Sequence, residues 1–227
     1  MVKVSVVVCA KNEEKYLEPC LKALKAQTIK PEIIVVNGHS TDKTIEIAKK
    51  YADKIVKDNK KGIGEARDIG AEISSGEIIA YCDADAVPPK EWVKKILNLI
   101  KDVDCVSGSA IPYDGPWHLK ANLNFWAGWI PQIATLFGFH NVWGFNMALR
   151  KHVFKKCKFK YKFLEDFYMG EQLRKAKFKC KFSKKLAIPI SSRRFWKEGF
   201  YELCSKYYIG YVLKEKIIGE RSVGYFQ

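Results

Sequence analysis

Two aspartates follow a short apolar run near the middle of the chain. Asp83 and Asp85, separated by Ala84, come directly after residues 78–82. A short apolar run is typical of a strand covered on both faces, and parallel α/β sheets bind ligands where the carboxyl ends of their strands emerge. Mg²⁺ and Mn²⁺ prefer oxygen ligands, and Mg²⁺ usually takes one or two protein carboxylates besides water and substrate phosphates. The pattern predicts a divalent metal and a phosphorylated ligand, unless Asp85 only caps a helix starting near residues 88–89.

Other nucleotide and metal motifs fit this sequence poorly. Residues 62–67, Gly-Ile-Gly-Glu-Ala-Arg, begin like a dinucleotide-binding fingerprint. Arg67, however, stands where the third small residue belongs, and a charged side chain there would block close packing of helix on strand. The sequence contains no G-x-x-x-x-G-K-[ST] motif, and its four histidines lack metalloprotease spacing. Asp83 and Asp85 therefore stay the best candidate cation site.

Alternating strand and helix patterns would place these aspartates at a sheet edge. Strand patterns occur at residues 4–8, 32–36 and 78–82, and helix patterns at 16–24, 45–51, 62–74 and 92–100. Ser40, Thr41 and Asp42 supply an N-cap signal for the second of these helices. Such alternation predicts an α/β fold with a mostly parallel, Rossmann-like sheet flanked by helices.

The second half of the chain has weaker patterns. Residues 104–108 and 142–149 indicate strands returning to the sheet. The aromatic segment 117–139 fits either the core or an interfacial face with an amphipathic belt. Residues 193–216 are aromatic, basic and roughly helical in period.

The net charge of +15 lies entirely in the second half. Residues 1–114 contain 18 Lys and Arg against 18 Asp and Glu, whereas residues 115–227 contain 22 against 7. This asymmetry predicts a polyanionic partner, either nucleic acid or an anionic membrane surface, although a solvated basic face is also compatible with it.

Cysteine usage and hydropathy indicate the compartment. The seven cysteines are scattered and include no C-x-x-C pair, which is typical of buried thiols in a reducing compartment. Strand 4–8 is too short for a secretion signal, and Pro131 and Gln132 interrupt the longest apolar stretch before it reaches the ~20 residues of a spanning helix. We therefore expect a cytoplasmic protein, with the basic half directed to the inner face of the cell membrane.

Several motifs in a fixed order resemble the family 2 glycosyltransferases of GT-A fold. They are residues 9–14 (Cys-Ala-Lys-Asn-Glu-Glu), 32–42, 64–70, 83–85, 144–150 and 164–166. Each motif alone is weak, and the specificity lies in their order over residues 3–190. The resemblance implies an inverting transfer of a sugar from a nucleoside diphosphate donor, such as a UDP- or GDP-sugar.

The resemblance also implies roles for the acidic residues. Asp83 and Asp85 resemble the pair that holds the donor diphosphate through Mn²⁺ or Mg²⁺, which would stabilise charge on the leaving group. Asp166 resembles the general base that deprotonates the acceptor, and Glu165 the acid that orients the site. Alternatively, Glu165 and Asp166 are first-turn acids that stabilise their helix through Arg174.

Further positions are carried over from the resemblance. The donor-binding set is Ala10, Asn12, Glu13, Asn37, Arg67, Asp83, Ala84 and Asp85. The acceptor- or phosphate-binding set is Gly144, Asn146, Arg193 and Arg194. Simpler interpretations are a surface helix position for Arg67, helix capping for Asn12 and Glu13, and a solvated basic pair at residues 193–194.

One departure from the family pattern concerns the donor base. Many members carry adjacent acidic residues after the second strand, where this chain has Asn37 and Gly38. Asparagine both donates and accepts hydrogen bonds, so uracil and guanine both stay open.

The sequence thus predicts a GT-A domain at residues 1–190, with a nucleotide-sugar half (1–114) and an acceptor half (115–190), followed by a basic aromatic extension (191–227). We expect a metal-dependent glycosyltransferase acting on a lipid-linked or cell-envelope acceptor in peripheral contact with a membrane. A nucleotidyltransferase of related fold is the alternative enzyme. A basic membrane-binding or nucleic-acid-binding protein is the non-catalytic alternative, although the chain contains no recognisable nucleic-acid module.

Overall fold

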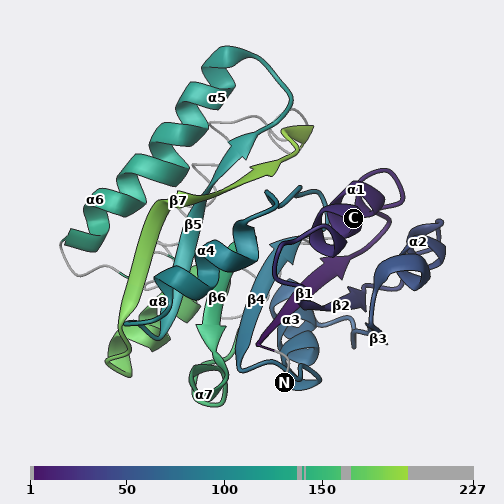
Figure 1. The fold of residues 1–227 in the computed structure, drawn as a ribbon, viewed down its shortest axis with the longest axis horizontal. Helices are drawn as coiled ribbons and strands as arrows, with labels where there is room; N and C mark the ends of the chain where they lie inside the picture. Colours follow the sequence, from purple (N-terminus) through teal and green to yellow (C-terminus); the bar gives the residue numbers. More distant parts are fainter. Residues whose placement is uncertain (1–2, 137–139, 141, 160–164, 194–227) are drawn as a thin grey trace, which may run out of the picture.

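The computed structural model describes residues 3–136, 140, 142–159 and 165–193 (Figure 1). In these ranges seven strands form one sheet in the order β3-β2-β1-β4-β6-β5-β7. The strands are β1 (Val4–Ala10), β2 (Glu32–Asn37), β3 (Lys54–Lys57), β4 (Ile78–Asp83), β5 (Cys105–Pro112), β6 (Asn146–Arg150) and β7 (Cys180–Ile190). All neighbouring strands pair in parallel except β6, which is antiparallel to both β4 and β5. The predicted α/β fold with a mostly parallel sheet is confirmed.

Helices cover both faces of this sheet (Figure 1). The helices are α1 (Leu17–Lys25), α2 (Thr44–Tyr51), α3 (Ile63–Glu72), α4 (Trp92–Leu99), α5 (Trp117–Asn124), the π-helical turn η1 (Phe125–Trp129), α6 (Ile130–Leu136), α7 (Lys151–Phe154) and α8 (Glu165–Lys175). Within the described ranges, no helix combines the length and hydrophobicity that crossing a bilayer requires.

The central strand β1 explains the two-sided core. Val4, Val6 and Val8 pack with α1 and α4 in one buried cluster, whereas Val7 packs with α3 and α8 in another. Alternate side chains of a strand point to opposite faces, so a strand that is apolar on both faces, as β1 is at every position but Ser5, must be covered on both sides. The apolar runs of the first half therefore form the central strands, with their polar ends at the sheet edge.

Several local predictions need correction. The strand expected at residues 142–149 begins only at Asn146, and the edge strand β3 was not predicted at all. Helix α4 begins at Trp92 with Glu91 at the N-cap position and no side-chain cap, so the interpretation of Asp85 as a helix cap is wrong. In the second helix the N-cap position is Lys43, although Asp42 accepts a hydrogen bond from the Thr44 main-chain N at 3.0 Å.

The structure also shows where the aromatic segment lies and whether the cysteines are paired. Of the aromatic segment 117–139, residues 117–136 form the continuous helical segment α5, η1 and α6, which exposes most of its large apolar side chains and buries only one side against the sheet; residues 137–139 lie outside the described residues. The six described cysteines are free thiols, four of them buried. The predicted C-terminal extension at residues 191–227, including the helical pattern at 193–216, lies outside the described residues except for 191–193.

Candidate active site

Parallel pairing brings the ends of three strands to one edge of the sheet. In the register of the sheet, Ala10 lies opposite Asn37, and Cys9 lies opposite Asp83. The carboxyl ends of β1, β2 and β4 therefore meet, as Figure 1 shows, and the loops that follow them share this edge. The predicted donor-binding positions Ala10, Asn37 and Asp83 are thus brought together by topology.

Arg67 is the centre of a buried group of charges. It lies on α3 with only 4% of its surface exposed. Its Nη1 donates to Glu165 Oε1 at 2.7 Å and lies 3.4 Å from Asp166 Oδ1, and its Nη2 lies 3.3 Å from Asp83 Oδ1. The planar guanidinium can serve several carboxylates at once, which an ammonium group cannot do with the same geometry. Arg67 is therefore not the surface helix residue of the simpler interpretation.

The surroundings of Arg67 fix its charge. Burial alone would lower the pKa of Arg67, but the carboxylates of Asp166, Glu165 and Asp83 hold it above its ordinary value. The guanidinium also lies 5.4 Å from the ring centre of Phe159, an aromatic contact that favours the cation. Arg67 stays charged and links the β4 end of the site to α8.

Asp166 and Glu165 lie in the first turn of α8 and face Arg67. Burial and, to a lesser degree, the nearby Glu165 carboxylate raise the pKa of Asp166, whereas Arg67 and the Gly144 main-chain N–H oppose this shift, so that the pKa lies at about 7. A carboxyl group with a pKa near neutrality can both take up and release a proton at working pH. The acids pair across the site with Arg67, and not with Arg174 in the last turn of their own helix as the alternative had it.

Gly144 allows this close approach. A Cβ atom at Gly144 would lie 2.3 Å from Arg67 Cζ and 2.6 Å from Asp166 Oδ1. Both distances are far shorter than a van der Waals contact, so any larger residue would displace the Arg67–Asp166 pair. The predicted position Gly144 thus belongs to the site through its lack of a side chain.

Arg193 closes a second ion-pair group beside the first. Its Nη2 lies 2.5 Å from Glu13 Oε1, its Nε lies 3.2 Å from Asp85 Oδ2, and its guanidinium lies 4.2 Å from the centre of the Tyr16 ring. Burial would lower the pKa of Arg193, but its hydrogen bond with Glu13 and the charge of Asp85 hold it above its ordinary value. Arg193 is thus half-buried between the loops after β1 and β4 and is not a solvated surface charge. Arg194 lies outside the described residues.

A turn anchored by Asp114 places Arg193. Asp114 Oδ1 accepts from the Ser192 main-chain N at 2.5 Å, and Asp114 Oδ2 accepts from Ser191 Oγ at 3.2 Å. The Ser191 main-chain N in turn donates to the Asp85 carbonyl at 3.2 Å. The turn after β7 is thereby fixed against the turn that carries Asp85.

Comparison with known proteins identifies the family and the fold. A family model described as glycosyl transferase family 2 matches residues 5–158. The chain belongs to glycosyl transferase family 2. Its sequence relatives include glycosyltransferase AglE of Haloferax volcanii, which is 34% identical over 117 residues, covering 47% of this chain and 38% of AglE. Another is the poly(ribitol-phosphate) beta-N-acetylglucosaminyltransferase TarS of Staphylococcus aureus, 33% identical over 111 residues, covering 45% of this chain and 19% of TarS. The matches thus span well under half of each relative's length.

Solved structures support the same fold. Glucosyl-3-phosphoglycerate synthase from Mycobacterium tuberculosis, solved with Mn²⁺, UDP and glucosyl-3-phosphoglycerate, superposes with a TM-score of 0.69 at 18% identity over all of this chain and 84% of that one. The mannosyltransferase PcManGT from Pyrobaculum calidifontis, solved with GDP-Man and Mn²⁺, has a TM-score of 0.67 at 18% identity, covering 92% of this chain and 64% of that one. At this identity the likeness shows the GT-A fold of the family.

The carboxylates of Asp83 and Asp85 are suited to bind a divalent metal ion. The two carboxylates flank Ala84 at the end of β4, and their side chains are 25% and 17% exposed. Among the described residues no group of three or more His, Cys, Asp and Glu side chains could hold a metal alone. Two carboxylates at an accessible edge are nevertheless the donor set of a cation that shares its coordination with a diphosphate and water. The residues present fit Mn²⁺ or Mg²⁺ held jointly with a nucleotide.

The loops after β1 and β2 are joined beside this site. Asn12, whose φ is 54°, accepts from the Thr41 main-chain N through Oδ1 at 2.9 Å, and its own N donates to Ser40 Oγ at 3.0 Å. Asn37 is buried and accepts from the Ser40 main-chain N at 3.0 Å. Asn12 therefore ties the two loops together instead of capping α1, whose N-cap position is Tyr16.

Asn146 is not brought together with the other site residues. Its side chain is fully buried, donates to the carbonyl oxygens of Ser109 and Leu186, and accepts from Trp92 Nε1 at 3.0 Å. These partners lie on β5, β7 and α4, so the amide is used inside the fold. Its role in this structure is to hold strands together.

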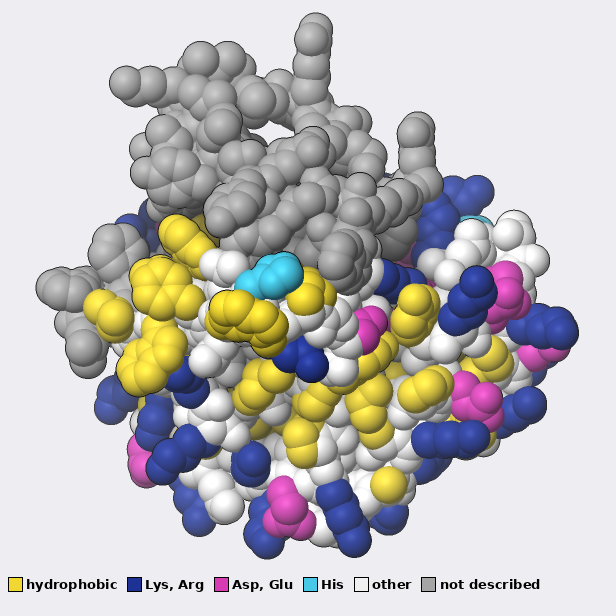
Figure 2. Space-filling model, turned by 90° about the horizontal axis from the view of Figure 1, so that it is seen from above, with side chains coloured by type: hydrophobic (Ala, Val, Ile, Leu, Met, Phe, Trp, Pro, Cys, Tyr) yellow, Lys and Arg dark blue, Asp and Glu magenta, His cyan; other side chains and the backbone are white. Residues whose placement is uncertain are grey.

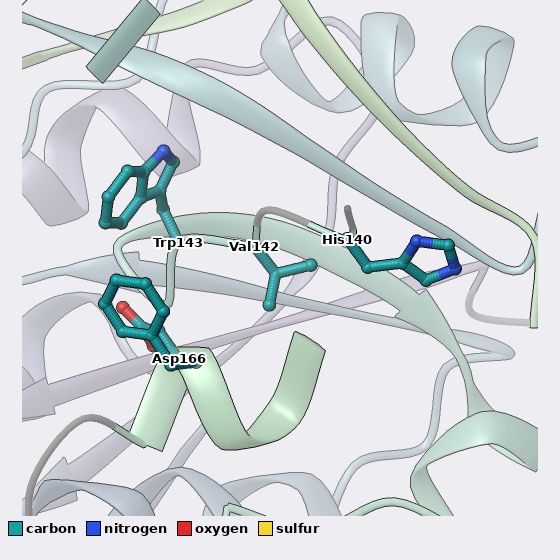
Figure 3. Close-up of a pocket in the computed structure, with 5 residues that line it drawn as sticks. His140, Val142, Trp143 and Asp166 are labelled. Carbon is teal, nitrogen blue, oxygen red and sulfur yellow. The ribbon is translucent and has the colours of Figure 1, made fainter. Parts of the chain in front are cut away.

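The structure adds aromatic and apolar residues that the sequence did not single out. His140, Val142, Trp143 and Phe167 line a small pocket with Asp166, and Figure 3 shows Trp143 and Asp166 at one end of it and His140 at the other. Trp143 stacks on Phe145 and meets Phe167 edge-on. The position of Trp143 directly before the Gly144 motif was the available sequence signal.

Proposed function

We propose that this chain catalyses a metal-dependent, inverting transfer of a sugar from a nucleoside diphosphate donor to a hydroxyl or phosphate group of an acceptor. The observation that carries the proposal is the buried Arg67, which joins Asp83 at the donor end of the site to Asp166 and Glu165. Membership of glycosyl transferase family 2 supports the same activity.

The donor half is formed by the strand ends. The loop that contains Asn12 and the end of β2 at Asn37 frame the nucleoside, and Asn37 replaces the acidic residue that many family members present to the base. Asp83 and Asp85 hold the cation, and a bound Mn²⁺ or Mg²⁺ would neutralise the charge that develops on the leaving diphosphate. The donor is a UDP- or GDP-sugar, which is supported by the solved structures of similar fold that contain UDP or GDP-Man.

The acceptor half is centred on Asp166. Its carboxylate takes the proton of the acceptor as the acceptor oxygen attacks the anomeric carbon from the face opposite the diphosphate, which inverts the configuration. A base with a pKa near 7 accepts this proton more readily than an ordinary aspartate would. Arg67 and the Gly144 N–H favour the deprotonated form of Asp166, and Glu165 holds Arg67 in place.

The acceptor that we propose is lipid-linked or part of the cell envelope and is used at the inner face of the cell membrane. The support is the excess of 22 Lys and Arg over 7 Asp and Glu in residues 115–227. The anionic lipids at the inner face of a cell membrane attract basic segments over about a Debye length.

An Asp166→Asn variant tests the catalytic assignment. We expect transfer to fall by about 10²–10⁴-fold, because the amide cannot take the acceptor proton, while UDP or GDP with Mn²⁺ still raises the melting temperature. Glu171→Gln, a change of a more exposed carboxylate on the same helix, should leave transfer unchanged. Substantial turnover by Asp166→Asn would remove Asp166 from the role of base, and release of pyrophosphate in place of a nucleoside diphosphate would identify a nucleotidyltransferase.

A further inference from the structure

The segment α5–η1–α6 carries an exposed apolar face. Its members are large side chains between 38% and 80% exposed: Trp117, Phe125, Trp126, Trp129, Ile130 and Ile133, here called the aromatic face. Figure 2 shows hydrophobic side chains gathered on the side of the molecule where α5 and α6 lie in Figure 1. Soluble proteins rarely expose a cluster of this size without a partner for it.

The opposite side of the same segment is packed on the sheet. Leu119, Leu123 and Ala127 are buried, and the segment lies along β5 and β7. The segment is therefore amphipathic and already packs one side against the sheet. Its aromatic face lies on the opposite side and is not part of the core of this domain. Trp117, at 80%, is the most exposed of the large apolar side chains in the described residues.

The formal charges on the segment itself and on the neighbouring strands β5 and β7 have one sign. Residues 117–136 contain a single Lys, Lys120, and no Asp or Glu. The neighbouring strand β7 contains Lys181, Lys184 and Lys185 and no acidic residue, and Lys184 Nζ lies 3.5 Å from the centre of the Trp129 ring. Strand β5 has no charged side chain. Tryptophan, phenylalanine and isoleucine bordered by lysine are the composition of helices that lie in the interface of an anionic bilayer.

We propose that the aromatic face docks this domain on the surface of a membrane that contains anionic lipid. The apolar rings enter the boundary between headgroups and acyl chains, and Lys120 and Lys184 meet the lipid phosphates. A second copy of the chain fits this face less well, because a two-fold contact would bring the lysines of both copies together. Docking would give the active site access to a lipid-linked acceptor, and this purpose rests on the proposed function.

The active site lies close to one end of this face. Trp117 begins α5 three residues after Asp114, and Asp114 binds the Ser192 main-chain N directly before Arg193. Arg193 in turn contacts Asp85 and Glu13 at the donor end of the site. A docked domain would thus hold this rim near the bilayer surface, where a lipid-linked phosphate or sugar is presented.

Vesicle sedimentation tests the proposal with the full chain. We expect binding to phosphatidylcholine vesicles that contain phosphatidylglycerol, weaker binding to phosphatidylcholine alone, and a decrease with added salt. The triple variant Trp126→Gln/Trp129→Gln/Ile133→Gln should bind about a hundredfold more weakly, because burying even part of three large apolar side chains changes partition by at least this factor. Ile55→Gln, at an exposed apolar position on β3 away from the aromatic face, is the control and should bind like the unchanged protein.

The outcomes separate docking from catalysis. Undiminished vesicle binding by the triple variant would overturn the docking proposal. So would the finding that the unchanged chain does not bind vesicles and forms a dimer in light scattering that the triple variant does not form. The thermal shift with UDP or GDP and Mn²⁺ should be the same in the triple variant as in the unchanged protein. Vesicle binding that depends on the aromatic face without any nucleotide response would uphold docking while removing the proposed transferase function.

Discussion

Replacing Arg67 by methionine should destabilise the protein in a strongly pH-dependent way. The substitution leaves Asp83, Glu165 and Asp166 without the buried cation that lies within 3.4 Å of each of them. Removing one partner of a buried ion pair costs about 3–5 kcal/mol of unfolding free energy, because the remaining charge stays desolvated. For a chain of this size the melting temperature should fall by roughly 6–20 °C.

The pH dependence follows from the pKa of Asp166. In the folded protein this pKa is raised from its ordinary value of 3.8 to about 7, so the contribution of Asp166 to stability is present below about pH 4 and is lost as the pH rises to 7. Arg67 opposes this shift. Without it the folded-state pKa rises further, the loss continues to higher pH, and the difference in melting temperature from the unchanged protein should be larger at pH 8 than at pH 5.

Arg150→Met is the matched control for this experiment. Arg150 is also partly buried, but it donates to the main-chain carbonyls of Ile100, Lys101 and Val103 and not to carboxylates. Its loss should lower the melting temperature by a similar amount at both pH values. Scanning calorimetry or dye-based melting of both variants at pH 5 and pH 8 measures the difference. An Arg67→Met deficit that is the same at both pH values, or smaller than that of Arg150→Met, would refute the reasoning.

Three further predictions concern catalysis and binding. Because Asp166 must be deprotonated to act as a base, kcat/KM should rise with pH through about 7 and then level off, and a profile that is flat between pH 5 and pH 8 would contradict this role. Gly144→Ala should lower kcat by about 10²-fold, since its Cβ would displace the Arg67–Asp166 pair; kinetics like those of the unchanged enzyme would show that the pair has room to move. Asp83→Ala/Asp85→Ala should abolish the Mn²⁺ dependence of nucleotide affinity in calorimetry, and an affinity that still responds to Mn²⁺ would place the cation elsewhere.

The sequence predicted the part of the fold that local patterns encode. The apolar run before Asp83 is uninterrupted and the run after Lys3 is broken only by Ser5, so both predict strands covered on both faces, and β4 and β1 are such strands. Strand β3 was not predicted because Lys54–Lys57 has only two apolar residues and is the outermost strand of the sheet. The start of β6 was placed too early because Val142 and Trp143 are as apolar as a strand, although they face the pocket beside Asp166.

The aromatic segment shows a different limit of sequence analysis. An apolar stripe at helical spacing has the same pattern whether it faces the core or an interface. The choice depends on which neighbouring elements compete for the core, and here Leu119 and Leu123 occupy the packed side while Trp117 and Trp129 stay exposed. Only the packing of α5 on β5 and of α6 on β7 reveals this.

The sequence by itself determined the order of strands and helices in the first half apart from β3, the family motifs, and the acidic residues at strand and helix ends, because these depend on neighbours in the chain. The tertiary structure alone decided that Arg67 is buried among Asp83, Glu165 and Asp166 and that Arg193 joins Asp85 to Glu13. These ion pairs connect residues that lie far apart in the chain, and most join its two halves. Their charges can be close only because the folded sheet brings them to one edge, where burial also moves the pKa of Asp166 to the value that a base requires.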